Sequence, residues 1–273
     1  METERRIPSP LPTIGILPLL LGLGSMQGLQ PEPGLPAFDL AARQADLVLV
    51  LRPRAREGDR VLCKVLKSFG NPPPSGELVV LEPRALPRPQ TLQNGGAQLA
   101  FLRKAAGTGN FLLLQHPGTL VPWTEKRRRE LEPLLQVLLR KTGPKGRASA
   151  LLSLALENRP ARTRALALLT LCREGGMRYA DQGQRRLLLQ LLKNRSAEKS
   201  LRDVCARALA GAGDRELPAL MLRLLQKGEA KGLGPCFGNL LRQMLGTALA
   251  KERLQSALRG NPTNPDLRAA LGG

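Results

Sequence analysis

Hydrophobic positions in the second half of the chain recur with the period of an α-helix. Residues 197–226 contain two such helices. Gly211-Ala212-Gly213 is predicted to end the first, because glycine adopts the left-handed conformation at a helix C-terminus without steric cost, and Asp214 is the predicted cap of the second. Since each helix has one apolar face, the hairpin needs similar neighbours to bury both. The apolar positions, spaced i, i+3, i+4, i+7 and i+8, are Leu201, Val204, Cys205, Ala208 and Leu209, then Leu217, Leu220, Met221, Leu224 and Leu225.

The same register recurs on both sides of this hairpin. A shift of thirty-eight positions toward the N-terminus places Arg164 on Arg202, and a shift of thirty-six toward the C-terminus places Leu240 on Val204. Residues 124–260 are therefore predicted to form an all-α solenoid of about four helical hairpins, with 261–273 as a C-terminal tail or cap. A non-repetitive helical bundle is the alternative, since leucine-rich amphipathic helices are common.

The central hairpin resembles a HEAT-type repeat, in particular its short bacterial form. In that form an Arg-x-x-Ala-Ala-x-Ala-Leu helix is followed by Gly-Asp and a Leu-Pro-x-Leu helix. The matching residues here are Arg202 to Leu209, Gly213-Asp214 and Leu217-Pro218-Ala219-Leu220. The resemblance implies a stack of hairpins whose inner face is an extended binding surface.

Upstream of residue 124 the hydrophobic pattern changes to short runs separated by proline and glycine. Residues 72–76 (PPPSG) and 94–96 (NGG) are predicted breaks. Five short strands within residues 37–123 suggest a small antiparallel β-barrel-like domain, OB-like in its strand count. The expected strands are Asp46–Leu51, Arg60–Leu66, Glu77–Leu81, Gln98–Leu102 and Phe111–Leu114.

This region resembles a small β-domain found at the front of exported bacterial proteins. In that domain Ala-Asp-Leu-Val-x-Val opens the first strand, and the matching residues are Ala45 to Val50. A Val-Leu-Lys follows at Val65-Leu66-Lys67 and a Phe-Leu strand at Phe101-Leu102. Together with the helical half, these features predict an α+β protein of two domains.

Residues 1–36 form a leader and linker. Arg5-Arg6 precedes an apolar run from Ile14 to Leu23, which closes on small residues. A basic start, a short apolar stretch and small residues are typical of a secretory signal peptide, and the run is too short for a transmembrane helix, which needs about 20 residues. We therefore expect an exported protein in the periplasm, cell envelope or medium; a disordered leader on a cytoplasmic protein is the alternative.

The composition adds a strong positive charge. The chain has 42 Lys and Arg against 22 Asp and Glu, a formal net charge of +20. Such an excess of positive charge favours negatively charged partners. The Lys and Arg residues are spread along the whole chain, however, so compositional drift explains the excess equally well. Aromatic residues make up 3% of the chain, so leucine and alanine must fill the core, and base stacking by the β-domain is not supported.

No catalytic, cofactor or metal motif emerges from the sequence. The four cysteines have no metal-ligand spacing, and His116, the only histidine, lies in a predicted turn. Some DNA glycosylases are built from HEAT-like repeats, and such an enzyme would need a free carboxylate in a basic groove. We rank that enzyme third. The carboxylates to consider are Asp181, Asp203, Asp214 and Asp266.

The prediction for function is a non-enzymatic protein-binding or scaffold protein, monomeric and without cofactor or metal. Its partner is expected to be a protein or another acidic polymer, which meets polar side chains on the second helix of each hairpin. Nucleic-acid binding is the alternative, and it requires a cytoplasmic location. The predicted partner-binding residues are Arg185, Arg186, Gln190, Arg223 and Gln226.

Overall fold

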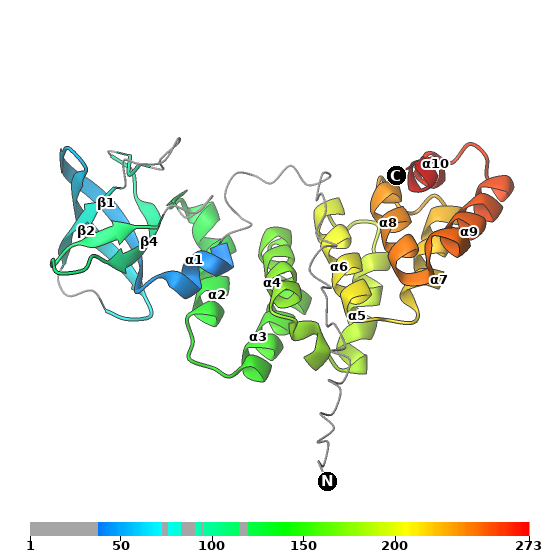
Figure 1. Cartoon of the computed structure of the whole chain (residues 1–273), viewed down its shortest axis with the longest axis horizontal. Coiled ribbons are helices and arrows are strands. Elements are labelled where there is room, and N and C mark those ends of the chain that lie inside the picture. The colour runs from blue at the N-terminus through cyan, green and yellow to red at the C-terminus, as the bar shows by residue number, and fades with distance from the viewer. Residues whose placement is uncertain (1–37, 73–75, 83–90, 94, 115–119, 273) are drawn as a thin grey trace, which may run out of the picture. The chain divides into compact units, whose positions relative to one another are not determined.

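A small β-barrel is followed by a series of helices, which confirms the predicted α+β layout in two regions (Figure 1). The predicted leader, His116 and a few loop segments lie outside the described residues. The computed structural model describes residues 38–72, 76–82, 91–93, 95–114 and 120–272.

The barrel is a closed ring of five strands. β1 pairs with β2, β2 with β3, β3 with β5, β5 with β4, and β4 with β1, while a sixth short strand, β6, adds to β4. All pairs are antiparallel except β3 and β5, which run parallel at Val80 and Phe111. A short helix, α1 (Phe38–Gln44), precedes the ring. The strands are β1 (Leu47–Glu57), β2 (Arg60–Phe69), β3 (Glu77–Leu81), β4 (Gln98–Lys104), β5 (Phe111–Leu113) and β6 (Val121–Pro122).

Alternating side chains fill the inside of the ring. On β2, Val61 and Cys63 are buried while Leu62 and Lys64 are exposed, as the two-residue period of a strand requires. Glu82, just after β3, is buried and accepts hydrogen bonds from the Arg56 guanidinium and from the backbone N–H of Leu92. The barrel core consists of Leu47, Leu49, Leu51, Val61, Cys63, Leu78, Val80, Leu92, Ala100, Leu102, Phe111 and Leu113.

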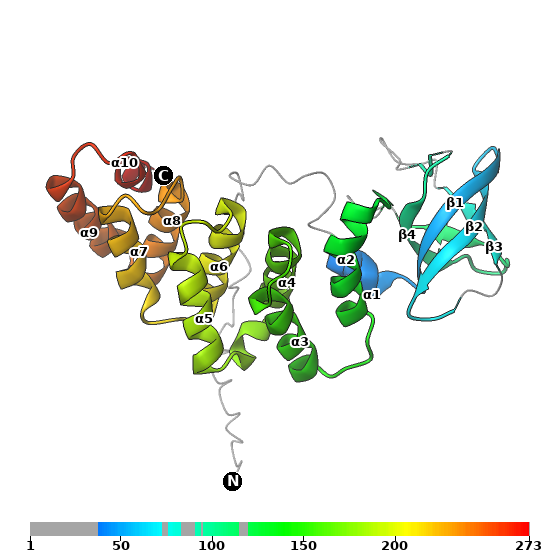
Figure 2. The same cartoon turned by 180° about the vertical axis from the view of Figure 1, so that it is seen from behind.

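The helices follow one another in chain order, and each hairpin lies beside the next (Figures 1 and 2). Thr124 caps the first of them, α2, as its hydroxyl accepts from the N–H of Arg127. The helix continues through Pro133. The elements are α2 (Glu125–Leu138), α3 (Pro144–Leu156), α4 (Ala161–Arg173), the 3₁₀ turn η2 (Gly176–Tyr179), α5 (Gln182–Lys193), α6 (Lys199–Gly211), α7 (Leu217–Gln226), α8 (Gly234–Leu245), α9 (Thr247–Gly260) and α10 (Pro265–Gly272).

These helices pack as two rows. In one row α4 packs against α6, α6 against α8, and α8 against α10, whereas α7 packs against α9 in the other. Helices that are consecutive in the chain join the rows, since α3 packs on α4, α5 on α6 and α7 on α8. The apolar stripes predicted for α6 and α7 are buried in full, from Leu201 to Leu209 and from Leu217 to Leu225.

The turn between α6 and α7 is a Schellman motif. The N–H of Gly213 donates to the Ala210 carbonyl at 2.9 Å, and that of Asp214 to the Leu209 carbonyl at 3.1 Å. Gly213 has φ +65°, which glycine alone adopts freely. The predicted glycine stop is confirmed, but the predicted capping role of Asp214 is wrong. Its carboxylate accepts from the Glu216 N–H at 3.0 Å, and this short turn through Arg215 and Glu216 delays the start of α7 to Leu217.

The four cysteines are free thiols that are partly or fully buried, Cys63 in the barrel core and the other three in the helical region. Burial raises the pKa of Cys172 to about 11 and that of Cys205 to about 12. The Sγ of Cys205 also donates to the Leu188 carbonyl at 3.1 Å. At a pH somewhat above 9.0, the ordinary pKa of a thiol, an exposed thiol ionises, whereas these thiols stay protonated in the folded protein.

Stability should fall in alkali for this reason. Below pH 9.0 both folded and unfolded thiols are protonated, whereas between 9.0 and about 12 only the unfolded chain loses the Cys205 proton. Each such thiol should cost up to about 1.4 kcal/mol per pH unit. Urea unfolding across this range should show a shallower pH dependence for Cys205→Ala than for the wild type, and equal slopes would contradict the prediction.

Candidate functional site

A hollowed surface of the described helices lies between α5 and the start of α7. A hollow of about 340 Å³ here continues into two others through shared residues, Arg185 on one side and Arg215 and Glu216 on the other. We call this continuous surface the α5–α7 groove. Its charged lining residues are Arg178, Arg185, Arg186, Lys193, Asp214, Arg215, Glu216 and Arg223.

The first turn of α5 is fixed by a capping box. The Asp181 carboxylate accepts from the Gln184 N–H at 2.7 Å, and the Gln184 side chain accepts from the Asp181 N–H at 3.0 Å. These bonds satisfy N–H groups that have no partner inside the helix. They hold Arg185 and Arg186 at the start of a stripe that continues through Leu189 to Lys193, all on the side of α5 that lines the groove.

The facing wall comes from α7 and the residue before it. Glu216, Ala219, Leu220 and Arg223 follow the spacing i, i+3, i+4 and i+7, so they share one face of the helix, and all four line the groove. Leu220 and, across the groove, Leu189 are largely buried. The groove thus has a closed apolar floor and charged rims.

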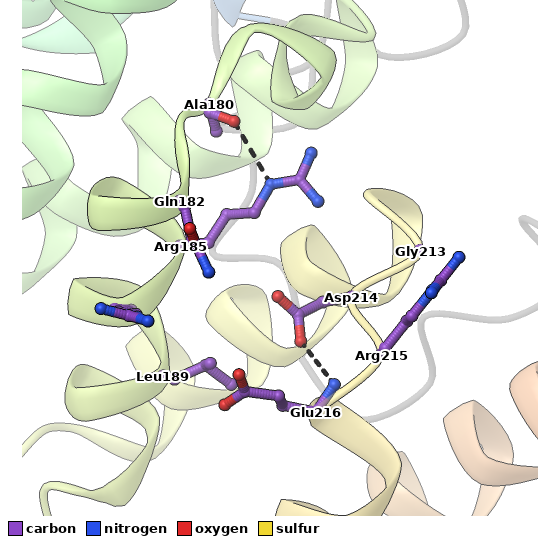
Figure 3. Close-up of a pocket in the computed structure, with 9 residues that line it drawn as sticks. Ala180, Gln182, Arg185, Leu189, Gly213, Asp214, Arg215 and Glu216 are labelled. Atoms are coloured by element: carbon purple, nitrogen blue, oxygen red, sulfur yellow. Dashed lines mark hydrogen bonds between the residues drawn. The ribbon is translucent and has the colours of Figure 1, made fainter.

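Arg185 ties the two walls together. Its Nε donates to the Ala180 carbonyl at 3.3 Å and its Nη1 approaches the Ala212 carbonyl at 3.5 Å. Figure 3 shows this guanidinium lying between the start of α5 and the loop that leads to α7. Arg185 therefore positions the groove walls and keeps only part of its donor capacity for a ligand.

The remaining groove cations are not neutralised by acids among the described residues. Some arginines elsewhere do meet acids: Glu130 accepts from Arg127 at 3.0 Å, and Asp203 accepts from Arg207 at 3.0 Å. Within the described part of the chain, four groove cations lie in no ion pair and make no side-chain hydrogen bond. They are Arg186, Lys193, Arg215 and Arg223, all exposed. Their fields add up along the groove, which favours an anionic ligand.

The groove contains part of the predicted binding set. Arg185, Arg186 and Arg223 all line it. Gln190 and Gln226 are exposed but are not among its lining residues. Sequence reasoning missed Lys193, Arg215 and Glu216. Lys193 lies seven positions after Arg186 and could have been found from the helical period, whereas the place of Arg215 and Glu216 depends on the Schellman turn.

The carboxylates considered for a glycosylase all have structural partners. Asp181 caps α5, Asp203 accepts from Arg207, Asp214 from the Glu216 N–H and Asp266 from the Gly232 N–H at 2.9 Å. Phe237 is buried, and Tyr179 lies against the Arg178 guanidinium. The described residues include no group of three His, Cys, Asp or Glu placed to hold a metal ion.

The phenylalanine side chains described on the barrel strands are buried. Phe111 belongs to the core inside the ring, Phe101 is fully buried on the opposite face of β4 from Ala100 and Leu102, and Phe69 is buried against Trp123, with ring centroids 5.7 Å apart. These rings are unavailable to stack on exposed bases, the usual role of aromatics in barrels that bind single strands. Across the described ranges no helix is both long and apolar enough to cross a membrane.

Comparison with known proteins adds no relative to this description. The chain matches no protein-family model, and neither the curated proteins nor the solved structures give a significant match.

Proposed function

We propose that this chain is a non-enzymatic binding or scaffold protein whose α5–α7 groove holds an acidic segment of a protein partner. One observation carries the proposal: four exposed cations without ion pairs among the described residues line the α5–α7 groove together with Arg185. Positive charges that lie close together without acidic partners repel one another. A bound anion reduces this repulsion and is therefore favoured in the groove.

We also propose a HEAT-like repeat architecture for the helices, and a repeated arginine supports it. Arg164 and Arg202, thirty-eight positions apart, each reach back to the end of the preceding helix: Arg164 Nε donates to the Ala155 carbonyl at 2.7 Å and Arg202 Nε to the Leu192 carbonyl at 3.0 Å. The same residue thus serves the same role in consecutive hairpins. In solenoids of this kind one row of helices forms an extended binding surface, and α5 and α7 line the two sides of one groove.

The barrel fits an OB-like domain, with a ring order of β1, β2, β3, β5, β4 and a parallel β3–β5 pair. OB-folds bind oligonucleotides or oligosaccharides across their strands and loops. Because Phe69, Phe101 and Phe111 are buried, we assign the barrel a structural or protein-binding role. The proposal includes an exported location, which is based on the signal-peptide-like pattern of residues 1–36.

The test uses the full chain and two labelled probes, poly-glutamate and an oligothymidylate, each titrated at about 0.1 M salt, where the screening length is about 10 Å. Charge reversal of Arg186 and Arg223 to glutamate should weaken poly-glutamate binding about tenfold, the equivalent of about 1.4 kcal/mol. Reversal of Arg253 and Arg259, two exposed arginines of α9 outside the groove, is the control and should cost less than about threefold.

Equal losses of poly-glutamate affinity in both double variants would mean that net charge alone attracts the probe. That result would overturn the proposal that the groove is the binding site. Tight, groove-dependent binding of the oligothymidylate with a steep salt dependence, and weak binding of poly-glutamate, would establish the nucleic-acid alternative, which the charge of +20 favours.

A further inference from the structure

One exposed acid lies among the groove cations. Glu216 is the N-cap residue of α7, and its N–H is fixed by the Asp214 carboxylate at 3.0 Å. It lines two adjoining hollows of the groove, one together with Arg186 and the other together with Arg223. In Figure 3 its side chain extends from the start of α7 toward Leu189 of α5, so its carboxylate lies across the groove.

This carboxylate is not neutralised by the cations around it. In the described part of the chain no ion pair within 4 Å includes Glu216, whereas Glu174 meets both Arg43 and Arg147. The other acid of the groove, Asp214, is buried and bonded to backbone. The negative charge of Glu216 interacts favourably with the positive end of the α7 helix dipole. This interaction leaves the carboxylate oxygens free to contact a ligand.

The pattern of charge in the groove is therefore mixed and ordered, with cations on both rims and one anion between them. A uniform polyanion, such as a nucleic acid, is attracted by the rims and repelled at Glu216. A peptide differs because it can place a lysine or arginine between acidic residues. Complementary charge at every position, rather than net charge, is what selects one partner over another.

We propose that the groove recognises an acidic protein segment that carries one basic residue, whose charge meets Glu216 while flanking carboxylates meet Arg186, Arg215 and Arg223. This inference rests on the proposed function and adds to it the class and charge order of the partner. It requires that a less negative ligand can bind more tightly than a more negative one.

Two synthetic peptides test that requirement with the full chain. Both are short glutamate homopolymers; one has a central lysine and the other a central glutamine. The wild type should bind the lysine peptide about threefold to tenfold more tightly, as one ion pair in a partly enclosed site contributes roughly 1 kcal/mol. In Glu216→Gln the preference should vanish or reverse. Glu252→Gln, which alters an exposed acid of α9 outside the groove, should retain it.

The outcomes separate this inference from the proposed function. Equal or tighter binding of the glutamine peptide by the wild type, with loss of both peptides on reversal of Arg186 and Arg223, would overturn the inference and leave an anion-binding groove. Retention of the lysine preference in Glu216→Gln would also overturn it. Absence of groove-dependent binding for either peptide would overturn the proposed function itself.

Discussion

Replacement of Arg202 by methionine is expected to lower the free energy of unfolding by about 3–5 kcal/mol, because several backbone carbonyls would lose their hydrogen-bond donor. Total stabilities are about 5–15 kcal/mol, so this would be a large part of the whole. Urea unfolding followed by far-ultraviolet circular dichroism would measure it, and the transition should shift to a much lower midpoint.

The reason lies in what the guanidinium bonds. Arg202 is 1% exposed, and it donates to three backbone carbonyls: Leu192 at 3.0 Å, Glu229 at 2.9 Å and Ala230 at 3.3 Å. These carbonyls belong to the end of α5 and to the loop before α8, so one side chain connects two consecutive hairpins. Methionine fills a similar volume but donates no hydrogen bond, and each buried carbonyl left unpaired costs about 1–3 kcal/mol.

Arg164 offers a matched control. It occupies the equivalent position in the preceding hairpin but is only half-buried, with its Nε bonded to the Ala155 carbonyl at 2.7 Å. Arg164→Met should cost about 1–2 kcal/mol, nearer to a single hydrogen bond. Equal midpoints for the two variants would show that burial and the extra bonds of Arg202 add nothing.

The elements bounded by turn residues were predictable from the sequence. β3 runs over Glu77–Leu81, as its pattern predicts, because proline and glycine precede it. β1 differs, since it continues to Glu57, six residues past the predicted end. Register shifts between Val50 and Leu51 and between Pro53 and Ala55 let the strand stay paired with β2 despite its proline. Such bulges depend on the partner strand, which a local pattern does not specify.

The groove was predictable only on one side. Helical period alone places Arg185 and Arg186 on a shared surface of α5, and the same rule applied once more reaches Lys193. The opposite wall depends on tertiary structure. The Schellman turn at Gly213 sets the direction of α7, and only then do Arg215 and Glu216 face α5. Periodicity predicted Gln190 and Gln226 as binding residues equally strongly, yet they do not line the groove. The helical period identifies which residues share a face of a helix, but not which neighbouring element that face contacts.

Gly238→Ala should undock the C-terminal helix. A Cβ at position 238 would lie 2.2 Å from the Ala270 carbonyl oxygen, and one at Gly234 would lie 2.3 Å from that of Asp266. Both obstacles are backbone of α10, which cannot move aside as a side chain can. The Ala270 carbonyl also accepts from Arg242 Nη1 at 3.0 Å, so the clash would break that bond too. We expect a loss of about 2–4 kcal/mol, at the upper end for overpacking.

Gly211→Ala separates this clash from any general effect of adding a methyl group. Gly211 ends α6, and no atom lies within 4 Å of a Cβ built there, so alanine should be neutral or stabilise by up to about 1 kcal/mol. Hydrogen exchange locates the damage: amides of α10 should lose protection in Gly238→Ala while those of α4 and α6 keep theirs. Equal unfolding midpoints for the two variants, or uniform loss of protection along the chain, would show that α8 and α10 are not held at the close approach that the two glycines permit. If α10 alone opens, it acts as a separable cap on the helical stack, and the α5–α7 groove should retain its affinity in the same variant.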